Sequence, residues 1–346
     1  MSVRLTYLDR GIGEDRGVVT LDGRPERLLI RRLGEEPRLQ LGAKLVARVA
    51  TVEAALGSAF LDLGGGLQAI LAFKPDARPV RGAAVAIEIR SRPRTGKLAT
   101  VRLVGTADGA PRLLEPGPTL DETLQALVRG AAPVLGAEAR DQADMAEAEA
   151  LETVHPLPDG GFLAIEPTRA LTAIDIDLGE RKGADAKRNA RQANLTALAQ
   201  TARLLRLKSL GGLVVIDLVG RGHDGAALLA AARTAFAPDN PGVAIGPVGR
   251  FGTMELSIPR RDQPLSEILC ELGGAASART LALRFMRRLE TEAMTQPGAR
   301  LSASCAPEPA AAMQDLAPLL ADRIGARFTI SERPGWPRER LDVAAL

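Results

Sequence analysis

Three aspartates in two short apolar segments have the clearest potential for chemistry in this sequence. Asp175 and Asp177 lie in LTAIDID, and Asp217 lies in LVVIDLV. Side chains alternate along a β-strand, so Asp175 and Asp177 share one face of their strand. Carboxylates held close together repel one another and favour a bound cation. Oxygen ligands without a His or Cys partner are typical of Mg²⁺ or Mn²⁺ sites.

The same aspartates also fit a structural role. They can cap strand ends or form salt bridges with nearby arginines, and the spacing alone favours that interpretation. Other catalytic schemes have less support, because His155 and His223 lie in expected loops without a serine or cysteine nucleophile motif. The sequence has no phosphate-binding glycine motif or dinucleotide fingerprint, and Gly64–Gly66 is typical of a turn between strands.

The segments around the aspartates predict a β-α-β unit. GGFLAIEP and LTAIDID predict two strands joined by a short turn, ANLTALAQTARLLRL predicts a helix, and LVVIDLV predicts a strand buried on both faces. The helix carries an apolar stripe made of Leu195, Leu198, Ala202 and Leu205. Because such a crossover places its strands side by side and parallel, we expect the aspartates to meet at the carboxyl edge of a sheet.

The two ends of the chain predict smaller domains. The order of strands and turns over residues 39–107 predicts an OB-fold barrel, with Phe60 and Phe73 as its aromatic residues. OB-folds stack bases on aromatic side chains, although a lone phenylalanine on a strand is more often core. Residues 265–346 predict a small α/β domain, with helices at TLALRFMRRLETEAM and AAAMQDLAPLLADRIG and strands at RLSASC and ARFTISE.

Charge is unevenly distributed along the 346 residues. The formal net charge is +3, and the basic residues are 39 arginines and 6 lysines, a bias that suits phosphate contacts but equally fits a GC-rich genome. Residues 76–112 carry eight basic residues and three acids, whereas residues 113–152 carry nine acids and two arginines. The first run can attract a polyanion and the second can repel one, while a solvated face is the default interpretation of either.

The sequence predicts a cytoplasmic protein without a membrane segment. Cys270 and Cys305 are too few for a disulfide framework and form no C-x-x-C pair, which fits a reducing compartment. The start, MSVRLTYLDRG, lacks the apolar core of a signal peptide, and the longest apolar runs, such as LVVI, are too short to cross a bilayer.

Three collinear segments closely resemble the catalytic region of the ribonuclease E/G family. They are GGFLAIEPTRALTAIDID, NLTALAQTARLLRLKSLGGLVVIDLV and GRFGTMELSIPRR. The resemblance implies a mixed α/β multidomain protein with an OB-fold inserted near the N-terminus and an RNase H-like and DNase I-like α/β catalytic core. Its implied parts are an N-terminal β segment of the core (1–38), the OB-fold RNA-binding domain (39–107), a shortened acidic linker (108–152), the catalytic α/β region (153–264) and the small C-terminal α/β domain (265–346).

The resemblance also implies an activity, which is Mg²⁺-dependent endonucleolytic cleavage of single-stranded RNA, with Mn²⁺ as a possible substitute. Asp175 and Asp217 match the family's metal ligands, and Asp177 would act beside them in catalysis. Phe60 and Lys97 match positions that contact RNA, and Arg250 is a candidate phosphate contact.

The sequence departs from the family pattern at several positions. Asp177 replaces the family's usual Asn, and Ile70 replaces a base-stacking Phe. Lys187 and Arg188 replace acids, and the short acidic linker stands in place of the segment that senses a 5′ monophosphate in the family. The zinc-link motif is reduced to CELGG, so Cys270 lacks its partner thiol and a zinc site shared between subunits is not expected. Assembly through other contacts stays open.

These departures leave two further interpretations open. One is an RNA-binding protein of the same ancestry whose catalytic site has decayed, which the changes at Asp177 and Ile70 favour and retention of Asp175 and Asp217 disfavours. The other is a metal-dependent phosphoesterase that acts on small nucleotides, which would leave the OB-fold without a role.

Overall fold

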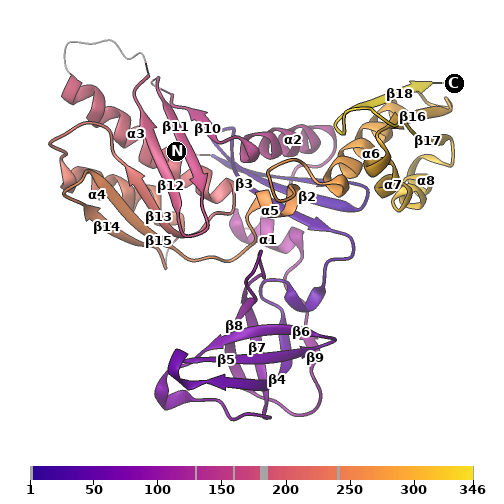
Figure 1. Cartoon of the computed structure of the whole chain (residues 1–346). Coiled ribbons are helices and arrows are strands. Elements are labelled where there is room, and N and C mark those ends of the chain that lie inside the picture. Colours follow the sequence, from indigo (N-terminus) through magenta and orange to yellow (C-terminus); the bar gives the residue numbers. More distant parts are fainter. Residues whose placement is uncertain (1–2, 129–130, 159, 180–185, 240–241, 346) are drawn as a thin grey trace.

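The computed structural model describes residues 3–128, 131–158, 160–179, 186–239 and 242–345. A central antiparallel sheet has the order β1-β2-β3, and three lobes surround it (Figure 1). Its strands are β1 (Arg4–Arg10), β2 (Glu14–Leu21) and β3 (Arg24–Arg32). Two helices pack against this sheet, α1 (Leu120–Leu127) and α2 (Ala137–Leu151).

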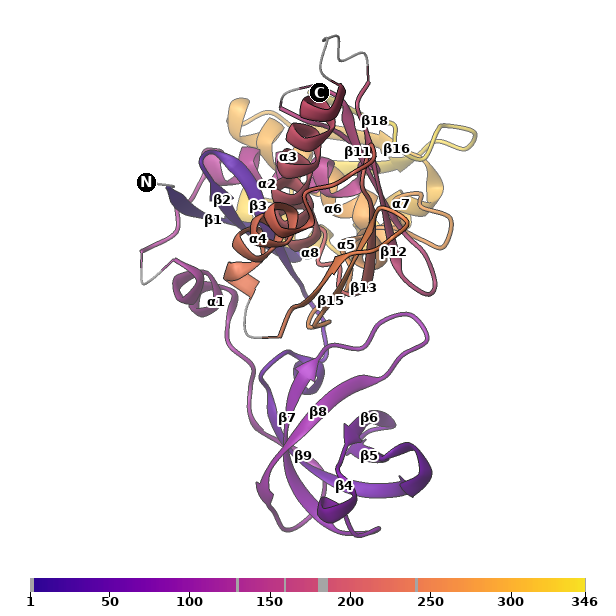
Figure 2. The ribbon, with the colours of Figure 1, turned by 90° about the vertical axis from the view of Figure 1, so that its left-hand side faces the viewer.

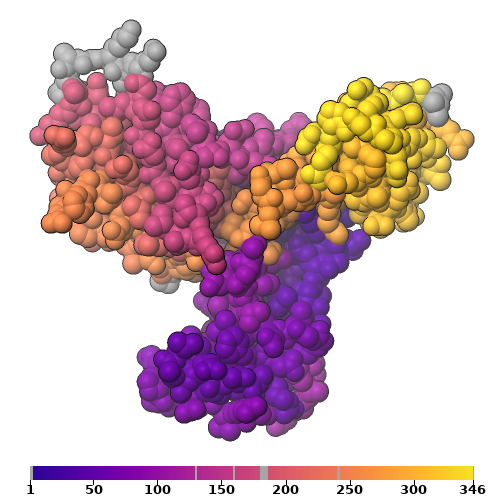
Figure 3. All heavy atoms as spheres, in the orientation of Figure 1, coloured from indigo at the N-terminus to yellow at the C-terminus, as the bar shows by residue number. Residues whose placement is uncertain are grey.

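The barrel lobe is a closed, OB-like barrel, as the sequence predicted. Five strands follow the order β4-β5-β6-β8-β7 and close through the pairing of β7 and β5 with β4, while β6 and β8 run parallel. They are β4 (Lys44–Glu53), β5 (Ser58–Gly64), β6 (Leu67–Ala72), β7 (Ala84–Ser91) and β8 (Ala99–Thr106), and β9 (Arg112–Glu115) adds to β4. Figure 3 shows this lobe as a separate projection below the other two.

The α/β lobe contains a six-stranded sheet. From one edge to the other its strands are β10 (Val154–Pro156), β11 (Phe162–Pro167), β12 (Thr172–Asp177), β13 (Gly212–Asp217), β15 (Thr253–Ile258) and β14 (Ala244–Val248). Helices α3 (Ala186–Leu207) and α4 (Gly225–Ala235) cover one face (Figure 2). β12 and β13 are parallel neighbours, which confirms the predicted β-α-β unit.

The C-terminal lobe packs α6 (Ala278–Thr295) against a three-stranded sheet of order β17-β16-β18. Its other elements are β16 (Leu301–Cys305), α7 (Pro307–Gln314), α8 (Ala317–Ile324), β17 (Phe328–Glu332) and β18 (Leu341–Ala345). The short helix α5 (Leu265–Leu269) precedes this lobe and packs against α2. The single helix predicted for AAAMQDLAPLLADRIG is wrong, because the segment divides into α7 and α8. Pro318 lacks the N–H that a continuous helix would need and lies in the first turn of α8.

A central ionic cluster joins β1, β2, α2 and α6; we define it as Asp9, Glu14, Arg16, Glu147 and Arg287. Arg16 donates to Asp9 at 2.6 Å and to Glu147 at 3.0 Å, and Arg287 donates to Glu14 at 2.8 Å. All five side chains are at most 6% exposed. The solvated-face interpretation of the acidic run 113–152 is therefore wrong for Glu147, which is buried against arginines.

Within the described ranges, four single 3₁₀ turns complete the elements, at Pro37–Leu39, Ala54–Leu56, Pro75–Ala77 and Ala237–Asp239. Among the described residues, no helix is long and apolar enough to cross a membrane.

Candidate active site

Asp175 and Asp217 are direct partners in the parallel register of β12 and β13. Neighbouring strands lie about 4.8 Å apart, so the two carboxylates extend from backbone positions that are side by side in the sheet. Both residues are exposed on the face opposite α3 and α4. Neither has a hydrogen-bond or ion-pair partner within the part of the chain that the structure describes. The salt bridges that the spacing alone favoured are thus not formed by this pair.

Asp177 lies two residues beyond Asp175 on the same exposed face of β12. One of its carboxylate oxygens, Oδ1, accepts a hydrogen bond of 2.7 Å from the backbone N–H of Gly179. Asp177 therefore caps the turn that follows β12. Its strand partner is Phe162, which is 47% exposed.

A buried asparagine holds the loop that follows Asp217. The Asn194 amide donates to the Val219 carbonyl at 3.0 Å, and its Oδ1 accepts from the Val219 N–H at 3.1 Å. Asn194 is 1% exposed and lies on α3, so this helix fixes the path of the chain two residues beyond Asp217. Sequence reasoning missed Asn194, although a polar residue within the apolar side of a helix is a signal for such a role.

The turn at 249–252 places Arg250 beside the same strand end. Gly249 donates to Thr253 at 2.7 Å, and Leu218 donates to Gly252 at 3.1 Å, which ties the turn to the residue after Asp217. The Arg250 guanidinium lies 4.5 Å from the centre of the Phe251 ring, and Phe251 is 78% exposed. An exposed cation and an exposed aromatic ring therefore flank the carboxylates.

A basic cavity of about 390 Å³ lies between the start of α3 and the loop after β13. Lys187, Arg191 and Arg221 line it together with His223. Arg191 has only a distant ion pair with Asp224, at 3.9 Å, and Lys187 and Arg221 have no partner among the described residues. Arg221 and His223 follow Asp217 by four and six residues, and Asp224 is the one acid among the described residues that line this cavity.

The residues present fit a partly hydrated Mg²⁺ ion better than a metal ion surrounded by protein ligands alone. Among the described residues, no group of three or more His, Cys, Asp or Glu side chains is arranged to hold a metal. Mg²⁺ usually keeps several waters and is held by one or two carboxylates with substrate phosphate. An adjacent, unpaired Asp175 and Asp217 provide that donor set.

The other predicted RNA contacts, Phe60 and Lys97, lie on the barrel lobe. Phe60 on β5 is half-buried and pairs across the strands with Ile70 on β6. Lys97 is exposed at the tip of the β7–β8 hairpin, where Arg94 and Lys97 exchange backbone hydrogen bonds of 3.1 and 2.8 Å. Thus Phe60 and Lys97 lie on the barrel, while the aspartates lie on the α/β lobe (Figure 1).

The β7–β8 hairpin attaches the barrel to the rest of the molecule. The Arg92 guanidinium binds Glu35 at 2.8 Å and Asp262 at 3.3 Å. At the tip, the Thr95 backbone N–H donates to Glu267 of α5 at 2.7 Å. These contacts hold Lys97 in a defined position relative to the residues that follow β15.

Residues 137–261 match the model of the ribonuclease E/G family, a region that contains Asp175, Asp177, Asp217 and Arg250. In this region the chain is similar to the ribonuclease E/G family. Phe60 and Lys97 lie outside the matched residues, in the barrel lobe. The similarity therefore bears on the aspartate pair more directly than on the barrel.

The chain matches its relatives over only part of their length. A ribonuclease E of Haemophilus influenzae is 37% identical over 150 residues, which are 40% of this chain and 16% of the relative. The ribonuclease E of Escherichia coli K12 is 35% identical over 150 residues, 40% of this chain and 14% of the relative. A ribonuclease G of Salmonella typhimurium is 25% identical over 214 residues, 57% of this chain and 43% of the relative. The matched part thus spans about a sixth of the ribonuclease E relatives.

Proposed function

We propose that this chain is an endoribonuclease that hydrolyses phosphodiester bonds in single-stranded RNA and requires Mg²⁺, with Mn²⁺ as a possible substitute. The observation that carries the proposal is the in-register pairing of Asp175 with Asp217 inside the region that matches the ribonuclease E/G family. Two exposed carboxylates without counter-charges are costly to keep together unless a cation or substrate uses them.

Each residue has a proposed role in this reaction. Asp175 and Asp217 hold the ion, which when bound would orient a water for in-line attack and neutralise charge on the phosphate. Asp177 adjusts the charge of the site through its carboxylate. Arg250 contacts a phosphate of the RNA, and Lys187 and Arg221 of the basic cavity offer further phosphate contacts.

The barrel lobe has a proposed role as the grip on the RNA strand. Phe60 stacks a base and Lys97 contacts the backbone, as OB-folds do with single strands. We also propose that the remaining lobes correspond to the RNase H-like and DNase I-like parts of the family's catalytic core. A cytoplasmic location agrees with Cys270 and Cys305, which are both free. Any self-association would not use a shared zinc site.

Cleavage of an end-labelled, unstructured RNA tests the proposal. The wild-type chain should cut with Mg²⁺ and not with EDTA, and an Asp175→Asn, Asp217→Asn double variant should lose at least about 10³-fold in rate. A matched control replaces two exposed aspartates of the C-terminal lobe, Asp315→Asn and Asp322→Asn. Equal Mg²⁺-dependent rates for both double variants would contradict the assignment.

A second candidate function is RNA binding without cleavage. Two observations favour it: the turn-capping hydrogen bond of Asp177, and Ile70 opposite Phe60, where a second aromatic ring would stack a base. It predicts RNA affinity that falls steeply with salt, no cutting by the wild-type chain, and unchanged affinity in the Asp175→Asn, Asp217→Asn variant. Filter binding and the cleavage assay on the same RNA separate the two functions.

A further inference from the structure

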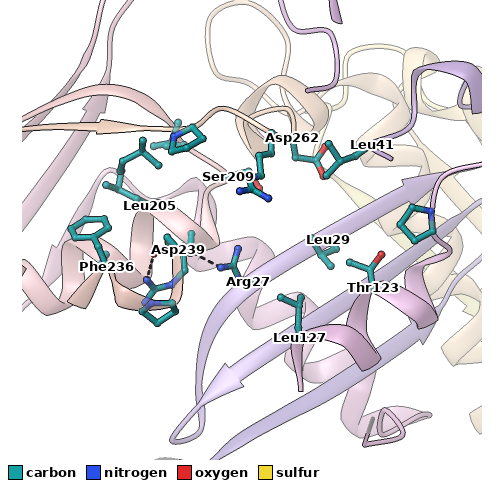
Figure 4. A pocket seen from close by; sticks show the side chains of 18 of the residues that line it. Arg27, Leu29, Leu41, Thr123, Leu127, Leu205, Ser209, Phe236, Asp239 and Asp262 are labelled. Atoms are coloured by element: carbon teal, nitrogen blue, oxygen red, sulfur yellow. Dashed lines mark hydrogen bonds and ion pairs between the residues drawn. The ribbon is translucent and has the colours of Figure 1, made fainter. Parts of the chain in front are cut away.

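A second cavity, of about 400 Å³, lies where the central sheet, α1, α3 and the end of β15 meet (Figure 4). It is separate from the candidate active site, because it is lined by Ile258, the strand partner of Gly212 at the start of β13, whereas Asp217 ends that strand. Apolar side chains form much of its lining, among them Leu29, Leu205 and Phe236. Leu127 of α1 lines the opposite side and is 37% exposed.

Cations outnumber anions in this lining. The charged side chains are Arg27, Arg31, Arg206 and Arg261 against Asp239 and Asp262, a formal excess of two positive charges. Figure 4 shows Arg27 and Asp239 joined across the cavity floor.

These six groups leave guanidinium donors unused. Asp239 pairs with two arginines, Arg206 at 2.6 Å and Arg27 at 3.1 Å. Arg206 also pairs with Glu26 at 3.0 Å, and Arg31 donates to the Ile30 carbonyl at 3.0 Å. Arg31 reaches Asp262 only at 3.7 Å, and the Arg261 guanidinium has no partner among the described residues. Unused N–H donors, those of Arg261 above all, therefore line a site that also has a large apolar part.

The cations are also partly removed from solvent. The side chain of Arg206 is 8% exposed and that of Arg27 is 27% exposed. Burial lowers the pKa of Arg27, against the attraction of Asp239 and in the same direction as the nearby charge of Arg206. A further anion in the cavity would offset this crowding of positive charge.

We propose that this cavity binds a small organic phosphate monoester, with the phosphate on the guanidinium groups and an apolar or planar body on Leu29, Leu205 and Phe236. A phosphate monoester carries a charge of about −1.5 to −2 at neutral pH, opposite in sign to the excess charge of the lining. Guanidinium groups bind phosphate oxygens in pairs. The volume lies within the range of about 300–1,000 Å³ that is usual for small-molecule sites.

Calorimetric titration of the full chain in EDTA tests the proposal, because EDTA removes metal from the candidate active site. The probes are phenyl phosphate, adenosine monophosphate, adenosine and inorganic phosphate. Both esters should bind, with adenosine and inorganic phosphate at least about tenfold weaker, since neither provides both the apolar body and the ester phosphate. Tighter binding of the nucleotide than of phenyl phosphate would identify a nucleoside as the body, and the reverse order a simpler apolar group.

Two variants locate the binding within this cavity. Arg261→Gln removes the unpaired guanidinium and should weaken both esters about 5–10-fold, and Leu127→Glu adds a negative charge at the rim and should weaken them further. Both positions are exposed, so neither change should prevent folding. Arg300→Gln, at an exposed arginine of the C-terminal lobe, is the control. Ester affinity that is undetectable in the wild type, or equal in Arg261→Gln, Leu127→Glu and Arg300→Gln, would overturn the proposal, whatever the cleavage assay gives.

Discussion

The acids of the central ionic cluster and the aspartates of β12 and β13 are two groups of carboxylates in opposite surroundings. In the cluster, Glu14 and Glu147 are buried, and each meets at least two arginines within 3.5 Å. At the sheet edge, Asp175 and Asp217 are exposed and have no cationic partner among the described residues. Buried carboxylates need counter-charges within the fold, whereas exposed neighbouring carboxylates can take one from outside it.

This difference separates acids that hold the lobes together from acids that are available for chemistry. The cluster joins β1, β2 and α2 to α6, so its ion pairs connect the central sheet with the C-terminal lobe. The aspartate pair connects no lobes. We therefore expect substitutions in the cluster to change the free energy of unfolding, and substitutions at the pair to change ion binding and activity.

The largest change in stability is expected for Arg16→Met. The side chain of Arg16 is fully buried, and its loss leaves Asp9 and Glu147 buried with fewer counter-charges. Removing one partner of a buried ion pair typically costs about 3–5 kcal/mol of unfolding free energy. Urea denaturation measures this, with Arg300→Met as the exposed control; a loss below about 1 kcal/mol would show that the cluster does not hold the lobes together.

A smaller effect, dependent on pH, is expected for Glu147→Gln. Burial alone would raise the pKa of Glu147, but the charges of Arg287, Arg16 and Arg284 outweigh it and lower the pKa below the usual value of 4.5. A carboxyl with a lowered folded-state pKa contributes stability above its unfolded pKa and loses it as the pH falls. Glu147→Gln should therefore cost about 1–3 kcal/mol at pH 7 and less below pH of about 4.5.

Thermal or urea unfolding at several pH values checks this dependence. The wild-type and Glu147→Gln curves should converge as the pH falls from about 5 towards 3. A difference between them that stays constant over this range would mean that the Glu147 charge does not stabilise the fold.

The smallest stability effect is expected for Asp217→Asn. Its carboxylate has no counter-charge among the described residues and lies beside Asp175, so removing its charge relieves repulsion. The free energy of unfolding should stay within about 0.5 kcal/mol of the wild type, or rise. A loss of 2 kcal/mol or more, roughly that of a buried hydrogen-bonded group, would place Asp217 with the structural acids instead.

The sequence predicted the aspartate pair better than the ionic cluster for a physical reason. A β-α-β crossover fixes which strands are neighbours, so the adjacency of Asp175 and Asp217 follows from local pattern and handedness. The partners in the cluster are far apart in sequence, as with Arg16 and Glu147, 131 residues apart, and no periodicity connects them. Asn194 was missed because its partner is the backbone of a loop 25 residues away.

For the helix that divides into α7 and α8, the sequence did contain a signal. Pro318 in AAAMQDLAPLLADRIG indicates a helix boundary, and the structure begins α8 at Ala317. The barrel was predictable, because its short alternating strands pair mainly with neighbours in sequence. The attachment of the barrel through Arg92 could not be predicted, because the partners of Arg92 are Glu35 and Asp262, which lie in separate segments of the chain.

Mn²⁺ binding, followed by the loss of the free-ion paramagnetic resonance signal, tests the central claim most directly. We expect one Mn²⁺ per wild-type chain, displaced by Mg²⁺ in competition, and the same for the Asp315→Asn, Asp322→Asn control. The Asp175→Asn, Asp217→Asn variant should bind none at the same concentrations. Undiminished Mn²⁺ binding by that variant would contradict the claim that these two aspartates form the metal site.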